Sequence, residues 1–259
     1  MGIPKERFSV GPVRVSALTF EAALAGVLDA RDAGDRLDVH FCTAHTVVEA
    51  SQSDQLRSAL GRAEVVAPDG MPLVWVGRLQ GRSVERVYGP DFMLAMFDQG
   101  RARGYRHYLY GGAPGVAEQL AERMSQRFTG LEVVGIQVPP FRALSPTEDA
   151  AAVDAINAAR PDCVWVGLGS PKQDLWVAEH RGRLDAAAVL AVGAAFDFHA
   201  GVKRQAPRWM QRSGTEWLFR LLSEPRRLWR RYTVINLRFL ALVTRQALSR
   251  GKRDEDSQL

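Results

Sequence analysis

The chain has 259 residues, 46% hydrophobic and 24% charged, and this balance excludes an extended disordered protein. Its length suits one large α/β domain with an appendage, or two small domains. The formal net charge of +5 is uneven: residues 201–259 hold fourteen Lys and Arg against five Asp and Glu, or +9, so residues 1–200 carry −4. A positive C-terminal block indicates an anionic partner, and membrane lipid, diphosphate and nucleic acid all fit it.

Short apolar runs alternate with helical patterns through the first 200 residues, which predicts a parallel sheet built from βαβ units. The expected strands are 39–43, 63–67, 107–110, 133–136, 163–167 and 189–192. Segments 115–128, 146–159 and 171–183 have helix lengths, and Ser145 followed by Pro146 is typical of a helix start. No repeat or low-complexity linker divides this part, so we expect a single α/β domain.

The two cysteines and the N-terminal segment indicate the cellular compartment. Cys42 and Cys163 lie inside apolar runs, so we expect two buried thiols and no disulfide framework. The N-terminus has no charged leader followed by an uninterrupted apolar stretch. We therefore find no secretory signal and expect a cytoplasmic protein.

Two glycine turns follow predicted strands. Gly111 and Gly112 precede a helix start, an arrangement that exposes backbone N–H groups to a phosphate, although a plain tight turn explains them equally well. Gly169 begins a second turn, after which Lys172 and Gln173 fall in the first turn of a helix. A cation there opposes the helix dipole unless an anion lies nearby, and a bound diphosphate would supply that charge.

Carboxylates follow two other strands. Asp69 lies at the sheet edge where open α/β sheets bind ligands, so it suits a general base; alternatively, it caps a helix that begins near Met71. Asp197 lies with His199 in a loop of small residues and either contacts a ligand or bonds to backbone or a nearby Arg. The folded part has no HExxH pattern and no Asp-x-Asp pair, so we predict no metal site.

The basic segment 209–248 predicts two or three helices, interrupted near Glu224 and Pro225. Nine basic residues and no acidic residue lie between positions 226 and 253. One face of the last helix is apolar, formed by Leu228, Tyr232, Ile235, Phe239 and Leu242. We interpret this helix as lying in a membrane interface, because it is too short and too often broken by Arg to span a bilayer. Alternatively, it packs on its own domain or on another subunit.

These observations divide the chain into three parts. We expect residues 1–203 to form the α/β domain, which would be the catalytic domain of an enzyme, residues 204–250 to form a basic helical appendage, and residues 251–259 to form a disordered tail.

Six segments in one order carry a resemblance to a known family. They are 42–50 (CTAHTVVEA), 68–75 (PDGMPLVW), 86–92 (RVYGPDF), 167–174 (GLGSPKQD), 196–207 (FDFHAGVKRQAP) and 214–232 (GTEWLFRLLSEPRRLWRRY). Together they resemble the WecG/TagA/CpsF glycosyltransferases, family 26, from about Val39 to Tyr232. The last segment is the most specific.

The resemblance implies a Rossmann-like parallel sheet flanked by helices, of the GT-E type, with a membrane-binding appendage. It implies an inverting transferase that uses a UDP-sugar donor and a polyprenyl-diphosphate-linked acceptor, without an obligatory metal or other cofactor. In the family pattern, Asp69 occupies the position of the proposed general base and Thr43 ends the active-site strand. Gln173 falls in the nucleotide-sugar pocket.

Without a metal, the departing UDP needs other positive charge, and Arg86, Lys172 and the C-terminal arginines are the available sources. Among the last we favour Arg220 and Arg227. The remaining residues that we assign to substrate binding are His45, Asp91, Gly111, Gly112, Gly169 and Asp197.

Two residues depart from the family pattern. His45 stands where many members have Asn, and Pro72 where Gly is common. We therefore do not assume N-acetylmannosamine as the donor sugar, and we slightly favour glucose or another hexose transferred in exopolysaccharide or cell-wall polymer assembly.

Two other classes of protein are alternatives to the transferase: a nucleotide-binding oxidoreductase and a non-catalytic basic protein. An oxidoreductase needs a glycine fingerprint on its first strand, which this chain lacks. A non-catalytic basic protein at a membrane surface fits the C-terminal aromatics, which suit a membrane interface better than nucleic acid, so we expect no nucleic-acid partner. We expect peripheral attachment to the inner face of the cell membrane. The oligomeric state stays open, and a homo-oligomer would hide part of the apolar surface.

Overall fold

The computed structural model describes residues 3–223 and 225–256, with their side chains except at 226–228, 230–232 and 250–256. Its main sheet has six strands in the order β4-β3-β8-β7-β5-β6, and every neighbouring pair runs parallel. The strands are β3 Leu37–Cys42, β4 Val65–Pro68, β5 Arg106–Gly111, β6 Glu132–Gln137, β7 Cys163–Gly167 and β8 Ala188–Ala191. Each overlaps one predicted strand, so the predicted parallel sheet is confirmed.

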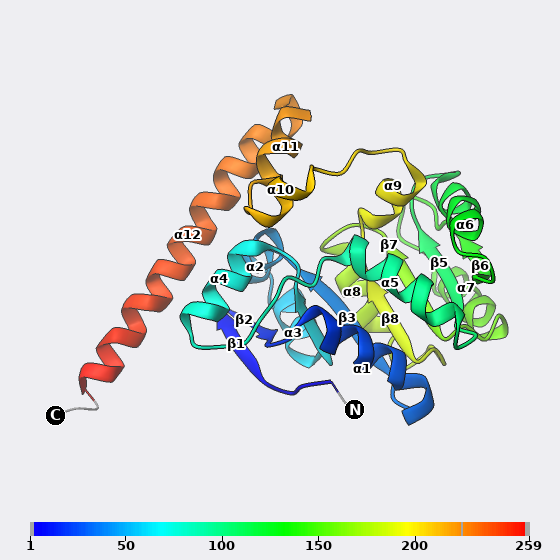
Figure 1. Cartoon of the computed structure of the whole chain (residues 1–259), viewed down its shortest axis with the longest axis horizontal. Coiled ribbons are helices and arrows are strands. Elements are labelled where there is room, and N and C mark those ends of the chain that lie inside the picture. The colour runs from blue at the N-terminus through cyan, green and yellow to red at the C-terminus, as the bar shows by residue number, and fades with distance from the viewer. Residues whose placement is uncertain (1–2, 224, 257–259) are drawn as a thin grey trace.

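Helices cover both faces of this sheet (Figure 1). One face packs against α1 Phe20–Ala33, α5 Gly89–Arg101, α6 Val116–Arg127 and α9 Ala195–Ala200. The other packs against α2 Ala44–Gln52, α3 Asp54–Arg62, α7 Pro146–Ala158 and α8 Lys172–His180. Because both faces are covered, a strand such as β7 is a continuous apolar run with Trp165 fully buried. Cys42 and Cys163 are buried free thiols, as predicted.

A two-stranded hairpin at the N-terminus was not predicted. β1 Arg7–Val10 and β2 Val13–Ser16 pair antiparallel around a turn in which Gly11 has a φ of 55°. The Ser16 hydroxyl accepts a hydrogen bond of 3.1 Å from the backbone N–H of Val66 in β4. The hairpin therefore partly covers the exposed edge of the main sheet.

The described part of the C-terminal segment forms three helices, where two or three were expected: α10 Arg208–Arg212, α11 Glu216–Ser223 and α12 Pro225–Asp256. α4 Met71–Leu79 lies below α10 in Figure 1. α12 continues through residues 251–256, which the sequence placed in a tail, and residues 257–259 lie outside the described part.

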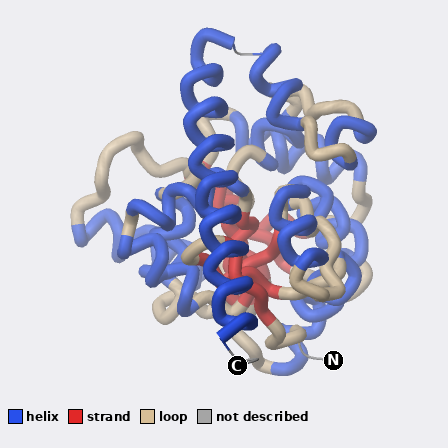
Figure 2. Tube along the Cα trace, turned by 90° about the vertical axis from the view of Figure 1, so that its left-hand side faces the viewer, coloured by secondary structure: helices blue, strands red, loops and turns tan. Residues whose placement is uncertain are grey.

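One face of α12 packs on the α/β domain itself, and Figure 2 shows the helix crossing that side of the molecule. Ile235 is buried, and Phe239 and Leu242 pack against the cluster of β1, β2, α2 and α3. The side-chain amide of Gln246 donates to the carbonyl of Ser9 at 2.8 Å. The predicted membrane contact of this face is therefore wrong for Ile235, Phe239 and Leu242, because these side chains pack within the chain.

The outer side of α12 keeps its own apolar residues. Leu237, Leu240 and Leu248 are each more than 60% exposed, and spacings of three and eight residues place them on one side of the helix. Exposed tryptophans lie at positions 75, 209, 217 and 229 of α4, α10, α11 and α12. No helix in the described ranges is both long enough and apolar enough to cross a bilayer.

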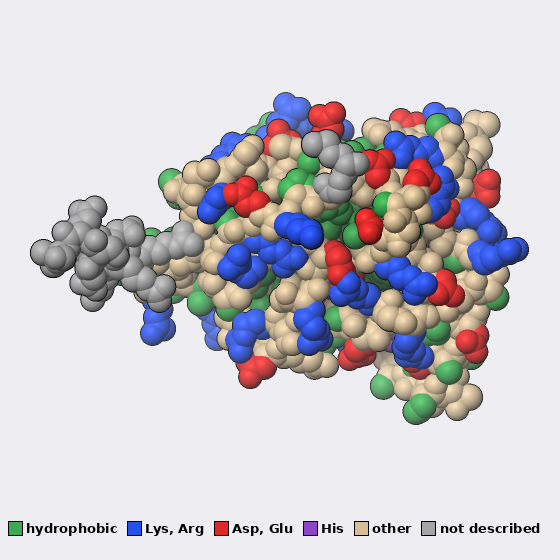
Figure 3. All heavy atoms as spheres, turned by 90° about the horizontal axis from the view of Figure 1, so that it is seen from below, with side chains coloured by type: hydrophobic (Ala, Val, Ile, Leu, Met, Phe, Trp, Pro, Cys, Tyr) green, Lys and Arg blue, Asp and Glu red, His purple; other side chains and the backbone are tan. Residues whose placement is uncertain are grey.

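Figure 3 shows the molecule from below the view of Figure 1, where the surface carries charges of both signs. Lys and Arg side chains alternate there with Asp and Glu over the α/β domain. A surface of mixed charge does not concentrate an anionic ligand.

Candidate active site

The loops at the carboxyl ends of the strands meet where the helices after neighbouring strands turn to opposite faces. α2, after β3, packs on one face, and α9, after β8, packs on the other. Such a divergence opens a crevice, which is where parallel α/β sheets bind ligands. Figure 1 shows α10 and α11 lying beyond this edge of the sheet.

Thr43 and Asp69 lie side by side at this edge. The backbone N–H of Asp69 donates to the carbonyl of Cys42 at 2.9 Å, and a Cβ on Gly70 would lie 3.8 Å from the Cα of Thr43. The Thr43 hydroxyl caps α2, accepting from the backbone N–H of Thr46 at 3.3 Å. β3 and β4 thus hold the two predicted catalytic residues in neighbouring positions.

The Asp69 carboxylate is 13% exposed. Gly70 is the N-cap of α4 and no side chain caps that helix, so the alternative role of Asp69 as its cap is wrong. Instead, a Cβ on Gly89 at the start of α5 would lie 3.7 Å from Asp69 Oδ2, and the Gly89 N–H bonds to the carboxylate.

Burial raises the pKa of Asp69 to about 6. The guanidinium groups of Arg86 and Arg220 lower it, but not enough to offset the burial and the nearby Glu216 carboxylate. At neutral pH the group is mainly ionised, yet it is more basic than an ordinary Asp, as a general base requires.

Arg86 is enclosed between the α/β domain and the appendage. Its Nε donates to the carbonyl of Asp69, and its Nη1 donates to the carbonyl of Gln211 in α10 at 3.1 Å. Nη2 lies 2.7 Å from Glu216 Oε2 and 3.5 Å from Asp69 Oδ1. The guanidinium stacks over the ring of Tyr88, 4.1 Å from its centroid. Arg86, predicted to hold diphosphate, thus lies beside Asp69 with Glu216 as its nearest acid.

The appendage brings Glu216 and Arg220 to this point. Arg220 Nη2 donates to Glu216 Oε1 at 3.0 Å, and the Arg220 guanidinium lies 5.3 Å from the ring centroid of Phe198. Sequence reasoning missed Glu216, although its spacing of four from Arg220 was a visible signal. The side chain of Arg227, the other favoured arginine, lies outside the described residues.

A hollow of about 270 Å³ adjoins this network. Its lining includes three arginines and Asp91, one of the predicted binding residues; the arginines are Arg86, Arg208 and Arg212. Because Glu216 pairs with Arg86, the positive charge available to an anionic occupant comes mainly from Arg208 and Arg212.

A second hollow of about 400 Å³ lies between α2, the β7–α8 loop and α12. Its lining includes His45, Ser170 and Arg238. The His45 Nε2 lies 3.6 Å from Glu49 Oε1. This predicted substrate-binding residue therefore faces a hollow that is also lined by the C-terminal helix.

The first glycine turn is tightly packed. The N–H of Gly112 donates to the carbonyl of Gly167 at 3.0 Å, and a Cβ on Gly111 would lie 2.8 Å from the Gly167 backbone. Gly111 and Gly112 have φ values of 115° and 84°, which other residues rarely adopt. Since the Gly112 amide is already bonded, the geometry favours the tight turn over the phosphate loop.

The buried side-chain amide of Gln173 holds the second glycine turn, the one at Gly169, in place by hydrogen bonds. Gln173 Oε1 accepts from the N–H of Gly169 at 3.0 Å, and Gln173 Nε2 donates to the carbonyl of Ala191 at 2.9 Å. Gln173 therefore ties the β7 loop to β8. Lys172 is exposed beside it, and the described residues include no ion-pair partner for it. Asp197 pairs with Lys203 at 2.5 Å, so its partner is a nearby Lys and not the backbone or the Arg that the structural alternative named.

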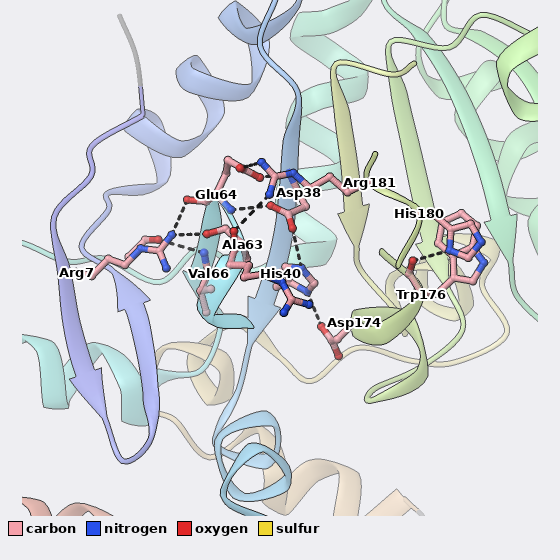
Figure 4. Close-up of polar contacts among 12 residues, drawn as sticks. Arg7, Asp38, His40, Ala63, Glu64, Val66, Asp174, Trp176, His180 and Arg181 are labelled. Atoms are coloured by element: carbon pink, nitrogen blue, oxygen red, sulfur yellow. Dashed lines mark hydrogen bonds and ion pairs between the residues drawn. The ribbon is translucent and has the colours of Figure 1, made fainter. Parts of the chain in front are cut away.

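A buried histidine lies next to the same loop, and Figure 4 shows His40 between Asp38 and Asp174. The Ser170 hydroxyl donates to Asp174 Oδ2 at 2.8 Å, and Asp174 Oδ1 lies 2.9 Å from His40 Nδ1. On its other side, His40 Nε2 lies 3.7 Å from Asp38 Oδ2. Burial alone would lower the pKa of His40, but the two carboxylates raise it to about 9. A buried imidazolium therefore links β3 to the loop that carries Ser170.

Residues 8–253 match the sequence model of the WecG/TagA/CpsF family of glycosyl transferases. The chain belongs to that family. It is therefore a glycosyltransferase, as the order of its motifs predicted, rather than an oxidoreductase or a non-catalytic surface protein. A similar protein is the N-acetylglucosaminyldiphosphoundecaprenol N-acetyl-beta-D-mannosaminyltransferase of Bacillus spizizenii. It is 31% identical over 184 residues, which are 71% of this chain and 69% of the relative.

Proposed function

We propose that this enzyme transfers a hexose or N-acetylhexosamine from a UDP-sugar to a polyprenyl-diphosphate-linked acceptor, with inversion, and that Asp69 is the general base. The observation that carries the proposal is the partly buried Asp69 carboxylate at the carboxyl edge of the sheet, beside a hollow lined by three arginines. The printed name of the relative supports the lipid-diphosphate acceptor.

In the proposed reaction, Asp69 accepts the proton of the acceptor hydroxyl while that oxygen bonds to the anomeric carbon. The bond between that carbon and the UDP oxygen breaks, and the electron pair leaves with UDP. The charge that develops on the diphosphate is stabilised by arginines of the appendage and the domain, among which Arg86 and Arg212 line the adjoining hollow. Displacement from the opposite face of the sugar turns an α-linked donor into a β-glycoside.

The donor sugar is the least determined part of the proposal. The relative's name makes UDP-N-acetylmannosamine the first donor to test, with UDP-glucose beside it. His45 and Glu49 line the 400 Å³ hollow, and both can bond to sugar hydroxyls.

A lipid-linked acceptor requires the enzyme to work at a membrane. We propose that it attaches peripherally to the inner face of the cell membrane through the outer sides of α11 and α12. The exposed side chains of Leu222, Leu237 and Leu240 support this, since apolar groups next to a basic segment favour an anionic bilayer surface.

The test measures UDP release from several UDP-sugars with a polyprenyl-diphosphate-linked acceptor. Asp69→Asn should lower acceptor-dependent kcat by about 10²- to 10⁴-fold, because it removes the proton acceptor with little change in shape. Asp98→Asn is the matched control, since Asp98 is an exposed carboxylate paired with Arg101 on α5.

The pH profile gives a second test of the base. The wild-type kcat/KM should rise with pH through about 6. Full activity in Asp69→Asn would show that the base lies elsewhere.

A further inference from the structure

Glu216 occupies a position that the proposed reaction does not yet use. It is the first residue of α11 in the appendage, and its side chain is 14% exposed. Oε2 accepts from Arg86 at 2.7 Å, and Oε1 accepts from Arg220 at 3.0 Å and from the Tyr88 hydroxyl at 3.3 Å. Donors from both parts of the chain therefore converge on one carboxylate.

A structural explanation is the simplest alternative. An acid in the first turn of a helix is favourable against the helix dipole, and an i, i+4 pair with Arg220 adds a little more. Neither effect requires the contacts with Arg86 and Tyr88, which lie about 130 residues away in the sequence. These two contacts place the charge next to Asp69.

Arg86 lies closer to the Glu216 carboxylate than to the Asp69 carboxylate. Its Nη2 is 2.7 Å from Glu216 but 3.5 Å from Asp69. Its Nε is bonded to the backbone carbonyl of Asp69 rather than to the carboxylate. Arg86 thus approaches Asp69 without forming a close pair with its side chain, and an Asp in a close pair with Arg is a much weaker base.

We propose that Glu216 is a positioning residue for the transfer reaction: it draws Arg86 away from a close pair with Asp69 and fastens α11 over the site. The inference rests on the proposed role of Asp69 as the base. The appendage would then take part in the chemistry, since the basicity of Asp69 depends on α11 being docked on the α/β domain.

The charges that face Asp69 agree with this arrangement. Arg86 on the segment before α5 and Arg220 on α11 lower its pKa, as does the Gly89 N–H at the start of α5. Burial and Glu216 raise it. The Tyr88 hydroxyl, whose own pKa is raised by burial, stays protonated near neutral pH and adds no charge. Removing the charge of Glu216 should therefore lower the pKa of Asp69.

The test combines a pH profile with direct titration of Asp69. Glu216→Gln keeps the size of the side chain but loses its charge. The midpoint of the kcat/KM profile should fall by roughly one pH unit. With the weaker base, kcat should fall about tenfold while KM changes less. In ¹³C-aspartate-labelled protein, the carboxyl signal that Asp69→Asn removes should titrate with the same downward shift.

Two further variants keep the proposal falsifiable. Glu216→Asp retains the charge and should restore most of the wild-type midpoint, whereas a purely structural role would make it no better than Gln. Glu132→Gln, which alters an exposed acid on β6, is the matched control and should leave the midpoint unchanged.

The outcomes separate this inference from the proposed function. An inactive Asp69→Asn with a wild-type midpoint and titration in Glu216→Gln would overturn the role of Glu216 alone. Full activity in Asp69→Asn would overturn the proposed base, and with it the inference. A shifted titration in Glu216→Gln together with an inactive Asp69→Asn supports both.

Discussion

The buried imidazolium of His40 should make the stability of this enzyme depend on pH. His40 is fully buried and lies between Asp174 and Asp38, and these carboxylates raise its pKa from 6.5 to about 9. This rise in the pKa of His40 corresponds to about 3 kcal/mol of stability. Because the folded-state pKa is raised, this contribution is complete below pH 6.5 and is lost as the pH rises through about 9.

The perturbation is Asp174→Asn, which keeps the shape of the side chain and removes its charge. The variant should be less stable by about 2 to 3 kcal/mol at pH 6, because a buried imidazolium loses its nearer carboxylate. Near pH 9 His40 is increasingly neutral in both proteins, so the difference should fall below about 1 kcal/mol.

The assay is urea unfolding followed by tryptophan fluorescence at pH 6, 7, 8 and 9. Asp185→Asn is the control: its carboxylate pairs with Arg36 but is 68% exposed, so it should change the free energy of unfolding by less than about 0.5 kcal/mol at each pH. A difference between Asp174→Asn and wild type that does not vary with pH would refute the reasoning, because it would mean that His40 is neutral throughout.

Three further predictions concern the glycine turn and the C-terminal helix. Gly111→Ala should cost more than about 1 kcal/mol, because its φ is 115° and the neighbouring backbone lies 2.8 Å from the new Cβ; Gly61→Ala, in open space on α3, should not lower the melting temperature. Gln246→Ala should cost about 1 to 2 kcal/mol in urea unfolding, because it removes two hydrogen bonds between α12 and the β1–β2 hairpin, one to Ser9 and one to Gly11. Leu237→Glu should weaken binding to anionic vesicles about tenfold in a sedimentation assay, and unchanged binding would exclude this side of α12 from the membrane contact.

Local patterns were sufficient for the six strands of the main sheet and for the helices α6, α7 and α8. The six buried strands are short apolar runs, and segments such as 146–159 combine helix length with a capping Ser, so the interactions that define them lie within a few residues. The order of the motifs also identified the family. The hairpin 7–16 was missed because β1 and β2 are stabilised by pairing with each other and, for β2, by contact with β4, and neither interaction is visible in a local pattern.

The sequence by itself determined the composition of the site edge, since Thr43, Asp69 and Gly169 follow parallel strands whose carboxyl ends must meet. Only the tertiary structure decided which partner each charge has and what covers each apolar face. The periodicity of α12 showed that one side is apolar, but Phe239 packs on the domain rather than on lipid. The pairing of Arg86 with Glu216 joins residues about 130 positions apart, and no local spacing encodes such a contact. It exists because the folded sheet and the docked appendage bring the two charges together.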